Sequence, residues 1–225
     1  MVIENNIVEM KERLSDYKNK ISGKTFLITG GAGFLGKNIV WVLQQFNKEL
    51  EEKCNIIVMD NYITGLENQF EIDDNIKVLQ QDISERFEVQ ENVDYILHAA
   101  GIASPVFYSK YKLETIQCTI QGTQNVLDIA KEKNPEGVLF FSTSEVYGNP
   151  ADDNVPTSES YNGNVSCVGP RAHYDEPKRV AETLCVTYAD IFDINVKIVR
   201  PFNVYGPGMR LDDGRGLINI VKSAI

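Results

Sequence analysis

A glycine-rich turn, GGAGFLG at residues 30–36, constrains the fold of this chain more than any other feature. It follows the short apolar segment Thr25–Thr29 and precedes a stretch with helical periodicity. Glycines allow a tight turn, and the N–H groups at the start of the following helix attract a pyrophosphate. A tight turn without a ligand is the alternative, but the strand–turn–helix order is typical of dinucleotide sites. We therefore expect a dinucleotide pyrophosphate to be bound by Gly30, Gly33, Phe34, Leu35 and Gly36.

Short segments rich in Val, Ile and Leu alternate with longer helical patterns from Thr25 onward. This alternation predicts an α/β fold, a Rossmann-type doubly wound parallel sheet with helices on both faces. The polar segment 149–170 predicts a loop. The predicted strands are Thr25–Thr29, Asn55–Asp60, Lys77–Gln81, Tyr95–Ala99, Val138–Ser142 and Val196–Arg200. The predicted helices are Gly33–Gln45, Lys112–Lys133, Arg171–Phe192 and a last one that starts near Leu217.

A helical extension is expected before the first strand, because apolar residues recur there at steps of three and four. These residues are Ile3, Ile7, Met10, Leu14 and Tyr17. The chain therefore divides into an N-terminal helical extension, 1–22, and a dinucleotide-binding domain, 23–225. We have no functional account of the extension beyond packing or self-association.

Composition excludes several classes of function. The formal net charge of −10 argues against nonspecific nucleic-acid binding. No apolar run approaches the roughly 20 residues needed to cross a bilayer, and the acidic start of the chain is unlike a secretory signal. The cysteines lack metal-ligand spacing, so we expect free thiols in the cytoplasm and no metal site. They are Cys54, Cys118, Cys167 and Cys185.

A carboxylate ends the second predicted strand at Asp60, 24 residues after Gly36. Such a carboxylate accepts hydrogen bonds from ribose hydroxyls and repels a 2′-phosphate, which favours NAD over NADP. The alternative is a turn-forming Asp before Asn61. Asp82 ends the third strand, where it is expected beside the adenine or only as a strand-end residue. The fourth strand ends at His98, which we interpret as structural, and is followed by the small residues Ala99 and Ala100.

Tyr174 precedes Lys178 by four residues, so the two side chains share one face of a helix. A phenol with an ordinary pKa is a poor base at neutral pH, and a nearby ammonium favours the phenolate. The spacing alone is also typical of an ordinary amphipathic turn. The fifth strand ends in TSEVYG, where Thr143, Ser144 and Glu145 are expected to face the pocket at the carboxyl ends of the strands. Strand-end capping is the alternative for the hydroxyls.

From Lys24 onward the sequence resembles the extended short-chain dehydrogenase/reductase family of nucleotide-sugar enzymes, and most closely its UDP-glucuronate decarboxylases. TSEVYG separates it from the 4,6-dehydratases, which usually have Asp at the position of Ser144. The matching motifs, in order, are GGAGFLG, Asp60-Asn61 with Thr64-Gly65, HAA before Ala103-Ser104-Pro105, TSEVYG, GPRAHYDEPKR, and Asn203 through Gly206-Pro207 to Asp213-Gly214-Arg215.

The resemblance implies a catalytic cycle. Tyr174 would take the proton of the sugar 4-hydroxyl while the C4 hydride passes to NAD⁺. Lys178 would lower the pKa of the tyrosine and bind the nicotinamide ribose. Thr143 or Ser144 would hold the 4-oxygen, and Glu145 would lie near the ring as a general acid/base or orienting group. The resulting 4-keto acid would lose its carboxylate, and NADH would then reduce the ketone.

Further residues and partners follow from the same resemblance. The substrate is expected to be a nucleotide sugar, with a UDP-sugar favoured. A homodimer is expected through the helices at Lys112–Lys133 and Arg171–Phe192. Residues added to the cofactor site are Asn61, Thr64, Gly65 and Ile83. Residues assigned to the substrate are Ser104, Pro105, Tyr108, Arg171, Asn203 and Arg215.

Several positions depart from the family pattern. Thr119 stands where relatives usually have Asn, and Gly208 where the decarboxylases usually have Arg. His173 and Pro177 replace residues that we expect to be small. Pro177 fits only if the helix starts close to Tyr174 or is bent there.

The resemblance also leaves the reaction open. Relatives continue beyond residue 225, so the domain 23–225 is expected to hold the NAD-binding domain and the start of the substrate-binding region. The smaller C-terminal substrate domain, with an arginine for the sugar carboxylate, would be largely absent. Alternatives are a 4-epimerase, a 4,6-dehydratase, a C4 dehydrogenase or a truncated, non-catalytic cofactor-binding fragment. The last alternative is motivated by residue 225, which falls inside a predicted helix.

Overall fold

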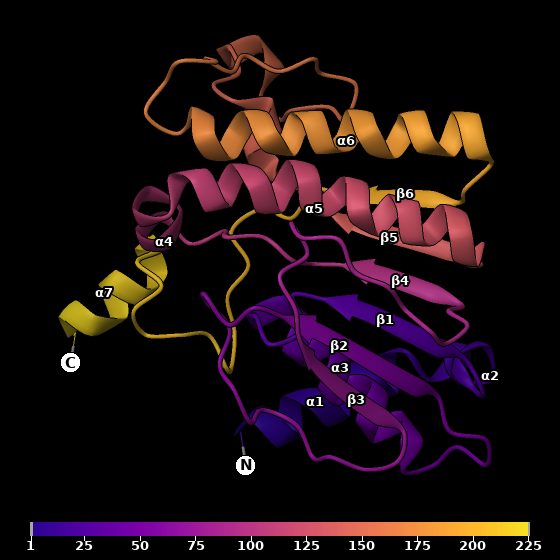
Figure 1. The fold of residues 1–225 in the computed structure, drawn as a ribbon. Helices are drawn as coiled ribbons and strands as arrows, with labels where there is room; N and C mark the ends of the chain where they lie inside the picture. The colour runs from indigo at the N-terminus through magenta and orange to yellow at the C-terminus, as the bar shows by residue number, and fades with distance from the viewer. Residues whose placement is uncertain (1, 225) are drawn as a thin grey trace.

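A computed structural model describes residues 2–224, and within them six strands form one parallel sheet (Figure 1). The strand order is β3-β2-β1-β4-β5-β6. From the centre of the sheet, β1, β2 and β3 follow one another toward one edge, and β4, β5 and β6 follow one another toward the other edge. The strand order therefore reverses between β1 and β4, as it does in a dinucleotide-binding Rossmann sheet. The strands are β1 Thr25–Thr29, β2 Asn55–Asp60, β3 Ile76–Gln80, β4 Tyr95–His98, β5 Gly137–Phe141 and β6 Val196–Val199. The predicted fold class is confirmed.

Helices cover both faces of the sheet because successive strand residues point to opposite sides. Phe26 and Ile28 of β1 pack with Val40 and Leu43 of α3 (Phe34–Asn47). Leu27, between them in the sequence, lies in a different cluster, with residues of α5 (Lys112–Lys133) such as Val126. Helix α6 (Ala172–Phe192) packs beside α5 (Figure 1). The sheet is thus wound on both faces, as predicted.

The N-terminal extension is a broken helix rather than one continuous helix. It consists of α1 (Val2–Arg13), the 3₁₀ turn Ser15–Tyr17 and α2 (Lys18–Ile21). Ile7 is 3% exposed and packs on Val42 and Phe46 of α3, whereas Leu14 and Tyr17 are exposed. The expected apolar stripe therefore contacts the domain only through its central part.

The other predicted elements agree with the structure to within one or two residues at most ends. Strands β3, β4, β5 and β6 end one residue earlier than predicted. A short helix, α4 (Pro105–Lys110), was not predicted. Its six residues are too few for a periodic pattern to stand out. The last helix, α7 (Gly216–Ala224), begins one residue before its predicted start.

Candidate active site

A cavity of about 500 Å³ opens at the carboxyl ends of the strands. This volume is within the range of small-molecule sites, and the location is the one expected for ligands of open α/β sheets. The glycine turn after β1 and the segments after β4 and β5 form part of the cavity wall. The start of α6 and the segment 201–217 complete the lining. Residues far apart in the chain therefore meet here.

The glycine turn has the geometry that its sequence predicts. Gly30 has a φ of +69°, and a Cβ on it would lie 2.5 Å from the backbone of Ala100. A Cβ on Gly36 would lie 2.3 Å from the carbonyl oxygen of Gly30. Glycine is therefore required at both positions for the turn to pack against β4 and against its own helix. Gly33 is the N-cap of α3, so the helix N-terminus opens into the cavity beside it.

Asp60 lies at the end of β2 beneath the turn and is 8% exposed. Its carboxylate accepts hydrogen bonds from the backbone N–H groups of Ala32 (2.9 Å) and Tyr62 (2.8 Å). Burial raises the pKa of Asp60, and these backbone donors oppose the rise. A carboxylate has about four acceptor positions, so Asp60 retains acceptor capacity for a ribose.

Other predicted cofactor residues group around Asp60. A second, smaller cavity of about 50 Å³ is lined in part by Asp60, Asn61, Thr64, Ile83, Ala99 and Ala100. Gly65 and Asp82 line neither cavity within residues 2–224. A Cβ on Gly65 would lie 2.8 Å from the Asp60 carboxylate, so a side chain at position 65 would clash with this carboxylate. Asp82 accepts from Asn61 (3.0 Å) and caps the turn at Ser84, which supports the strand-end interpretation of this residue.

Tyr174 and Lys178 both line the large cavity from the first two turns of α6. The Tyr174 ring is 6% exposed and stacks on Tyr108, with a centroid separation of 4.8 Å. The Lys178 ammonium donates to the carbonyl oxygen of Phe141 (2.7 Å) at the end of β5. The predicted placement on one helix face at the cavity is therefore found.

The electrostatics of this pair differ from the expectation. Burial raises the pKa of Tyr174, and the Thr143 hydroxyl and Arg215 oppose the rise only in part. Burial lowers the pKa of Lys178 to about 8. The expected lowering of the tyrosine pKa by Lys178 is thus not found, because desolvation outweighs the charges around the phenol.

The TSEVYG segment presents its polar groups to the same cavity. Thr143 is the N-cap of a 3₁₀ turn, Ser144–Tyr147, and its hydroxyl accepts from the backbone of Glu145. Thr143, Ser144 and Glu145 all line the cavity. The Glu145 carboxylate forms an ion pair with Arg171, the residue that precedes α6. The Thr143 hydroxyl therefore caps the turn, and Thr143 and Ser144 both line the cavity.

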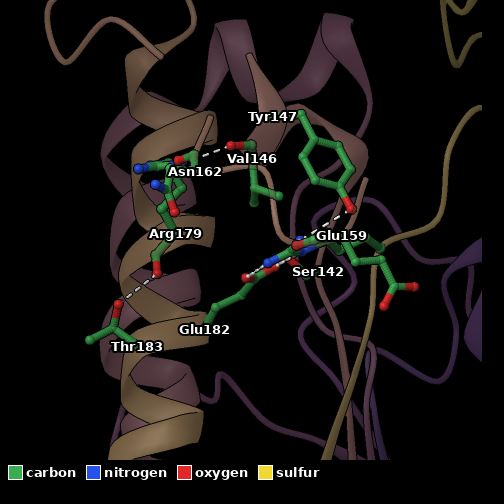
Figure 2. A network of polar contacts seen from close by, with 9 residues as sticks. Ser142, Val146, Tyr147, Glu159, Asn162, Arg179, Glu182 and Thr183 are labelled. Carbon is green, nitrogen blue, oxygen red and sulfur yellow. Dashed lines mark hydrogen bonds and ion pairs between the residues drawn. The ribbon is translucent and has the colours of Figure 1, made fainter. Parts of the chain in front are cut away.

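A polar network fixes the middle of α6 against the segment that follows β5 (Figure 2). Glu182 accepts from the Ser142 hydroxyl (2.5 Å) and forms two hydrogen bonds with Arg200 (2.8 and 2.6 Å). Arg179 donates to the carbonyl oxygen of Val146 (2.8 Å). Such paired, charge-assisted bonds are strong and directional. They hold the helix that carries Tyr174 in register with the TSEVYG segment.

The proposed substrate residues also line the cavity. Ser104 donates to the carbonyl oxygen of Asp213 (2.6 Å), and Arg215 forms an ion pair with the Asp213 carboxylate (3.0 Å). This ties the segment 201–217 to the start of α4. The cavity lining includes every residue assigned to the substrate, namely Ser104, Pro105, Tyr108, Arg171, Asn203 and Arg215.

Over residues 26–224 the chain matches the NAD dependent epimerase/dehydratase family. The chain belongs to this family. UDP-glucuronic acid decarboxylase 6 of Arabidopsis thaliana is 42% identical over 213 residues, which are 91% of this chain and 57% of that relative. The chain spans about half the length of the curated relatives it matches.

Solved structures agree with this assignment. A UDP-galactose 4-epimerase crystal structure has a TM-score of 0.71 and 25% identity, covering 88% of this chain and 62% of that one. The UDP-glucuronic acid 4-epimerase from Bacillus cereus, solved in complex with NAD, has a TM-score of 0.67 and 25% identity. That match covers 84% of this chain and 60% of the epimerase.

The residues of this epimerase/dehydratase-family chain fit NAD. Gly30 and Gly36 form a turn that no side chain could occupy, and the N-terminus of α3 opens into the cavity. Asp60 lies next to the turn with acceptor capacity to spare. Within residues 2–224 no group of His, Cys, Asp and Glu could hold a metal ion, and no helix is long and apolar enough to span a membrane.

Two buried polar side chains, His98 and Thr119, differ in whether their polar atoms have hydrogen-bond partners. His98 lies between the hydroxyls of Thr29 (2.8 Å) and Thr123 (3.0 Å), and burial lowers its pKa to about 3. The interpretation of His98 as structural is confirmed. Thr119, which replaces the usual Asn, has a buried hydroxyl with no hydrogen-bond partner in the described part of the chain.

Sequence reasoning missed Lys37 and Arg210, which also line the large cavity. Lys37 directly follows the last glycine of the turn, and that position was the available signal. Arg210 lies in a segment with no predicted element. It donates to the carbonyl oxygen of Thr64 (3.1 Å), a contact across 146 positions that no local pattern indicates.

Proposed function

We propose that the protein to which this chain belongs oxidises the C4 hydroxyl of a nucleotide sugar, and that it decarboxylates UDP-glucuronate through a 4-keto intermediate. The observation that carries the proposal is the meeting of Tyr174, Lys178, Thr143 and Glu145 with the glycine turn in one cavity. The 42% identity to a UDP-glucuronic acid decarboxylase supports the choice of reaction. The proposal concerns the whole protein, since the chain spans only part of such relatives.

Tyr174 is the base in this proposal. Its phenolate takes the proton of the 4-hydroxyl, and Thr143, which lines the same cavity, holds the same oxygen. Bound NAD supplies the hydride acceptor and, later, the donor. Lys178 is cationic below its pKa of about 8 and lies buried at the cavity, and in this proposal it binds the nicotinamide ribose.

Carboxylate loss then needs electron uptake and protonation. The C–C bond to the carboxylate breaks, its electrons enter the C4 ketone as an enolate, and carbon dioxide leaves. A proton then returns to C5, and hydride returns to C4. Glu145 lies at the cavity where such a proton could be exchanged. Arg171 and Arg215 line the same space and attract an anionic sugar.

A second candidate is 4-epimerisation, favoured by the likeness of this fold to a UDP-glucuronic acid 4-epimerase bound to NAD. Epimerisation uses the same oxidation at C4 but returns the hydride to the opposite face. A 4,6-dehydratase or a C4 dehydrogenase would use the same first step. A chain that binds cofactor without turnover is the alternative outside catalysis.

The decisive experiment incubates the full-length protein with UDP-glucuronate and catalytic NAD and measures the product by mass. Loss of carbon dioxide is expected. An unchanged mass with a new stereoisomer would replace decarboxylation by epimerisation. In the same assay Tyr174→Phe should abolish turnover while NAD affinity stays unchanged. Near-normal turnover in this variant would remove Tyr174 as the base.

We also propose a homodimer formed through α5 and α6. Supporting it, Leu113 of α5 and Val186 and Ile191 of α6 are 71%, 61% and 63% exposed. Sedimentation of the purified protein should give twice the mass of one chain. A reducing, cytoplasmic setting is proposed with it, supported by the free thiols of all the cysteines.

A further inference from the structure

Lys37 is a buried cation for which the described residues provide no anion. It is the fourth residue of α3 and is 4% exposed. In the described part of the chain its ammonium has no hydrogen bond or ion pair, and it lies 5.5 Å from the centroid of the Trp41 ring. Buried charges are normally paired, because desolvation is costly. An unpaired ammonium at a cavity therefore points to an anionic ligand.

The charges around Lys37 make the case stronger. Arg210, on the segment that crosses α3, is a second cation whose field acts on Lys37. Burial and this neighbour lower the pKa of Lys37. Arg210 has its own partner in Asp212, with hydrogen bonds of 2.8 and 2.6 Å, so that carboxylate is already engaged. Both cations line the cavity, where the N-terminus of α3 adds its own positive end.

The Lys37 side chain is held in place from two sides. A Cβ on Gly208 would lie 3.3 Å from Cε of Lys37 and 3.5 Å from the Trp41 ring. Trp41 is itself fixed, because its indole N–H donates to the carbonyl oxygen of Gln69 (2.7 Å). The Lys37 ammonium is therefore confined beside Trp41 and Gly208 at the cavity wall.

We propose that Lys37 is a phosphoryl-binding residue, whose ammonium binds an oxygen of a diphosphate ligand beside the N-terminus of α3. This inference rests on the proposed function, since it takes the ligand to be a dinucleotide or a nucleotide sugar. Either ligand brings the same chemistry, a diphosphate, to this wall of the cavity. Such a contact is a charge-assisted hydrogen bond in a site with little competing water.

Calorimetric titration of the full-length protein with NAD and, separately, with UDP tests the inference. Lys37→Met keeps the apolar stem against Trp41 and Gly208 but removes the charge. It should weaken binding of NAD, of UDP or of both by about tenfold or more. Lys37→Arg should retain most of the affinity. Lys48→Met, at the exposed other end of α3, is the matched control for net charge and should bind as the wild type does.

The two titrations show whether Lys37 binds the diphosphate of NAD or that of the nucleotide sugar. A loss confined to NAD assigns Lys37 to the cofactor, and a loss confined to UDP assigns it to the nucleotide sugar. Thermal melting without ligand should show Lys37→Met to be at least as stable as the wild type, because an unpaired buried charge is gone. Unchanged affinity of Lys37→Met for both ligands would overturn the inference alone, as would an equal loss in Lys48→Met. A wild-type protein that binds neither ligand would overturn the proposed function with it.

Discussion

Gly36→Ala is the sharpest test of the glycine turn, because the structure gives both the gain and the cost of the added methyl group. Gly36 lies inside α3, where alanine is favoured over glycine by about 1 kcal/mol. The new Cβ would lie 2.3 Å from the Gly30 carbonyl oxygen and 2.7 Å from Cα of Gly31. Contacts of this kind cost about 1–3 kcal/mol or more, because backbone atoms cannot rotate away. With the contact at the upper end of this range, ~3 kcal/mol, and the helix gain of ~1 kcal/mol set against it, we expect a net loss of about 2 kcal/mol in the free energy of unfolding.

The same substitution should also reduce NAD affinity. To relieve the contact, the start of α3 must move away from the turn, and the backbone donors that face the pyrophosphate move with it. Loss of one charge-assisted hydrogen bond lowers affinity by about tenfold. Urea unfolding and NAD titration measure the two effects independently.

Gly122→Ala provides the matched control. Gly122 also lies inside a helix, but its Cβ would meet Cδ1 of Ile83 at 2.6 Å, the far end of a flexible side chain. The helix gain and the small rearrangement should therefore nearly cancel, leaving stability within about 1 kcal/mol of the wild type. If Gly36→Ala were as stable as Gly122→Ala and bound NAD normally, the backbone contact in the turn would not constrain the site.

Two further predictions concern single charges. Asp60→Asn should reduce the preference for NAD over NADP by about tenfold in competition titrations, because the repulsion of a 2′-phosphate is lost. If the wild type bound NAD and NADP with equal affinity, Asp60 would not select the cofactor. Lys178 has a folded pKa of about 8, below its ordinary 10.5, so the unfolded state binds more protons between these values. The penalty for burying the ammonium is therefore full below pH 8 and disappears as the pH rises to 10.5. In urea unfolding at pH 7, the free energy of unfolding of Lys178→Met should exceed that of the wild type by up to ~3 kcal/mol. The two values should differ little near pH 10.5. A difference independent of pH would contradict the assigned pKa.

The sequence was sufficient for features that depend on local spacing. The alternation of apolar strands with helical patterns predicted the sheet and its long helices because each element must bury one face. The GGAGFLG turn predicted its own geometry, since the positive φ of Gly30 and the close packing of Gly36 follow from the absence of a side chain. The four-residue step from Tyr174 to Lys178 likewise placed both at one cavity.

Features that depend on tertiary neighbours were not predictable in this way. Helix α4 is short, and its position is fixed by the bond from Ser104 to the backbone of Asp213, 109 residues away. Arg210 reaches the site only because the chain crosses back over α3. The raised pKa of Tyr174 depends on how deeply the ring is buried, and a helical spacing carries no information about desolvation.

The balance around Tyr174 shows what its environment must provide for it to act as a base. Burial opposes the phenolate, and within the protein the opposing influences come from Thr143 and Arg215. Arg215 is oriented by its ion pair with Asp213, whose carbonyl oxygen is held by Ser104. Arg215 lines the cavity, and its charge also favours the ionised form of Tyr174. If Tyr174 is the base and Arg215 binds the substrate, as we propose, a ligand that draws Arg215 away from the phenol would weaken the base that acts on it.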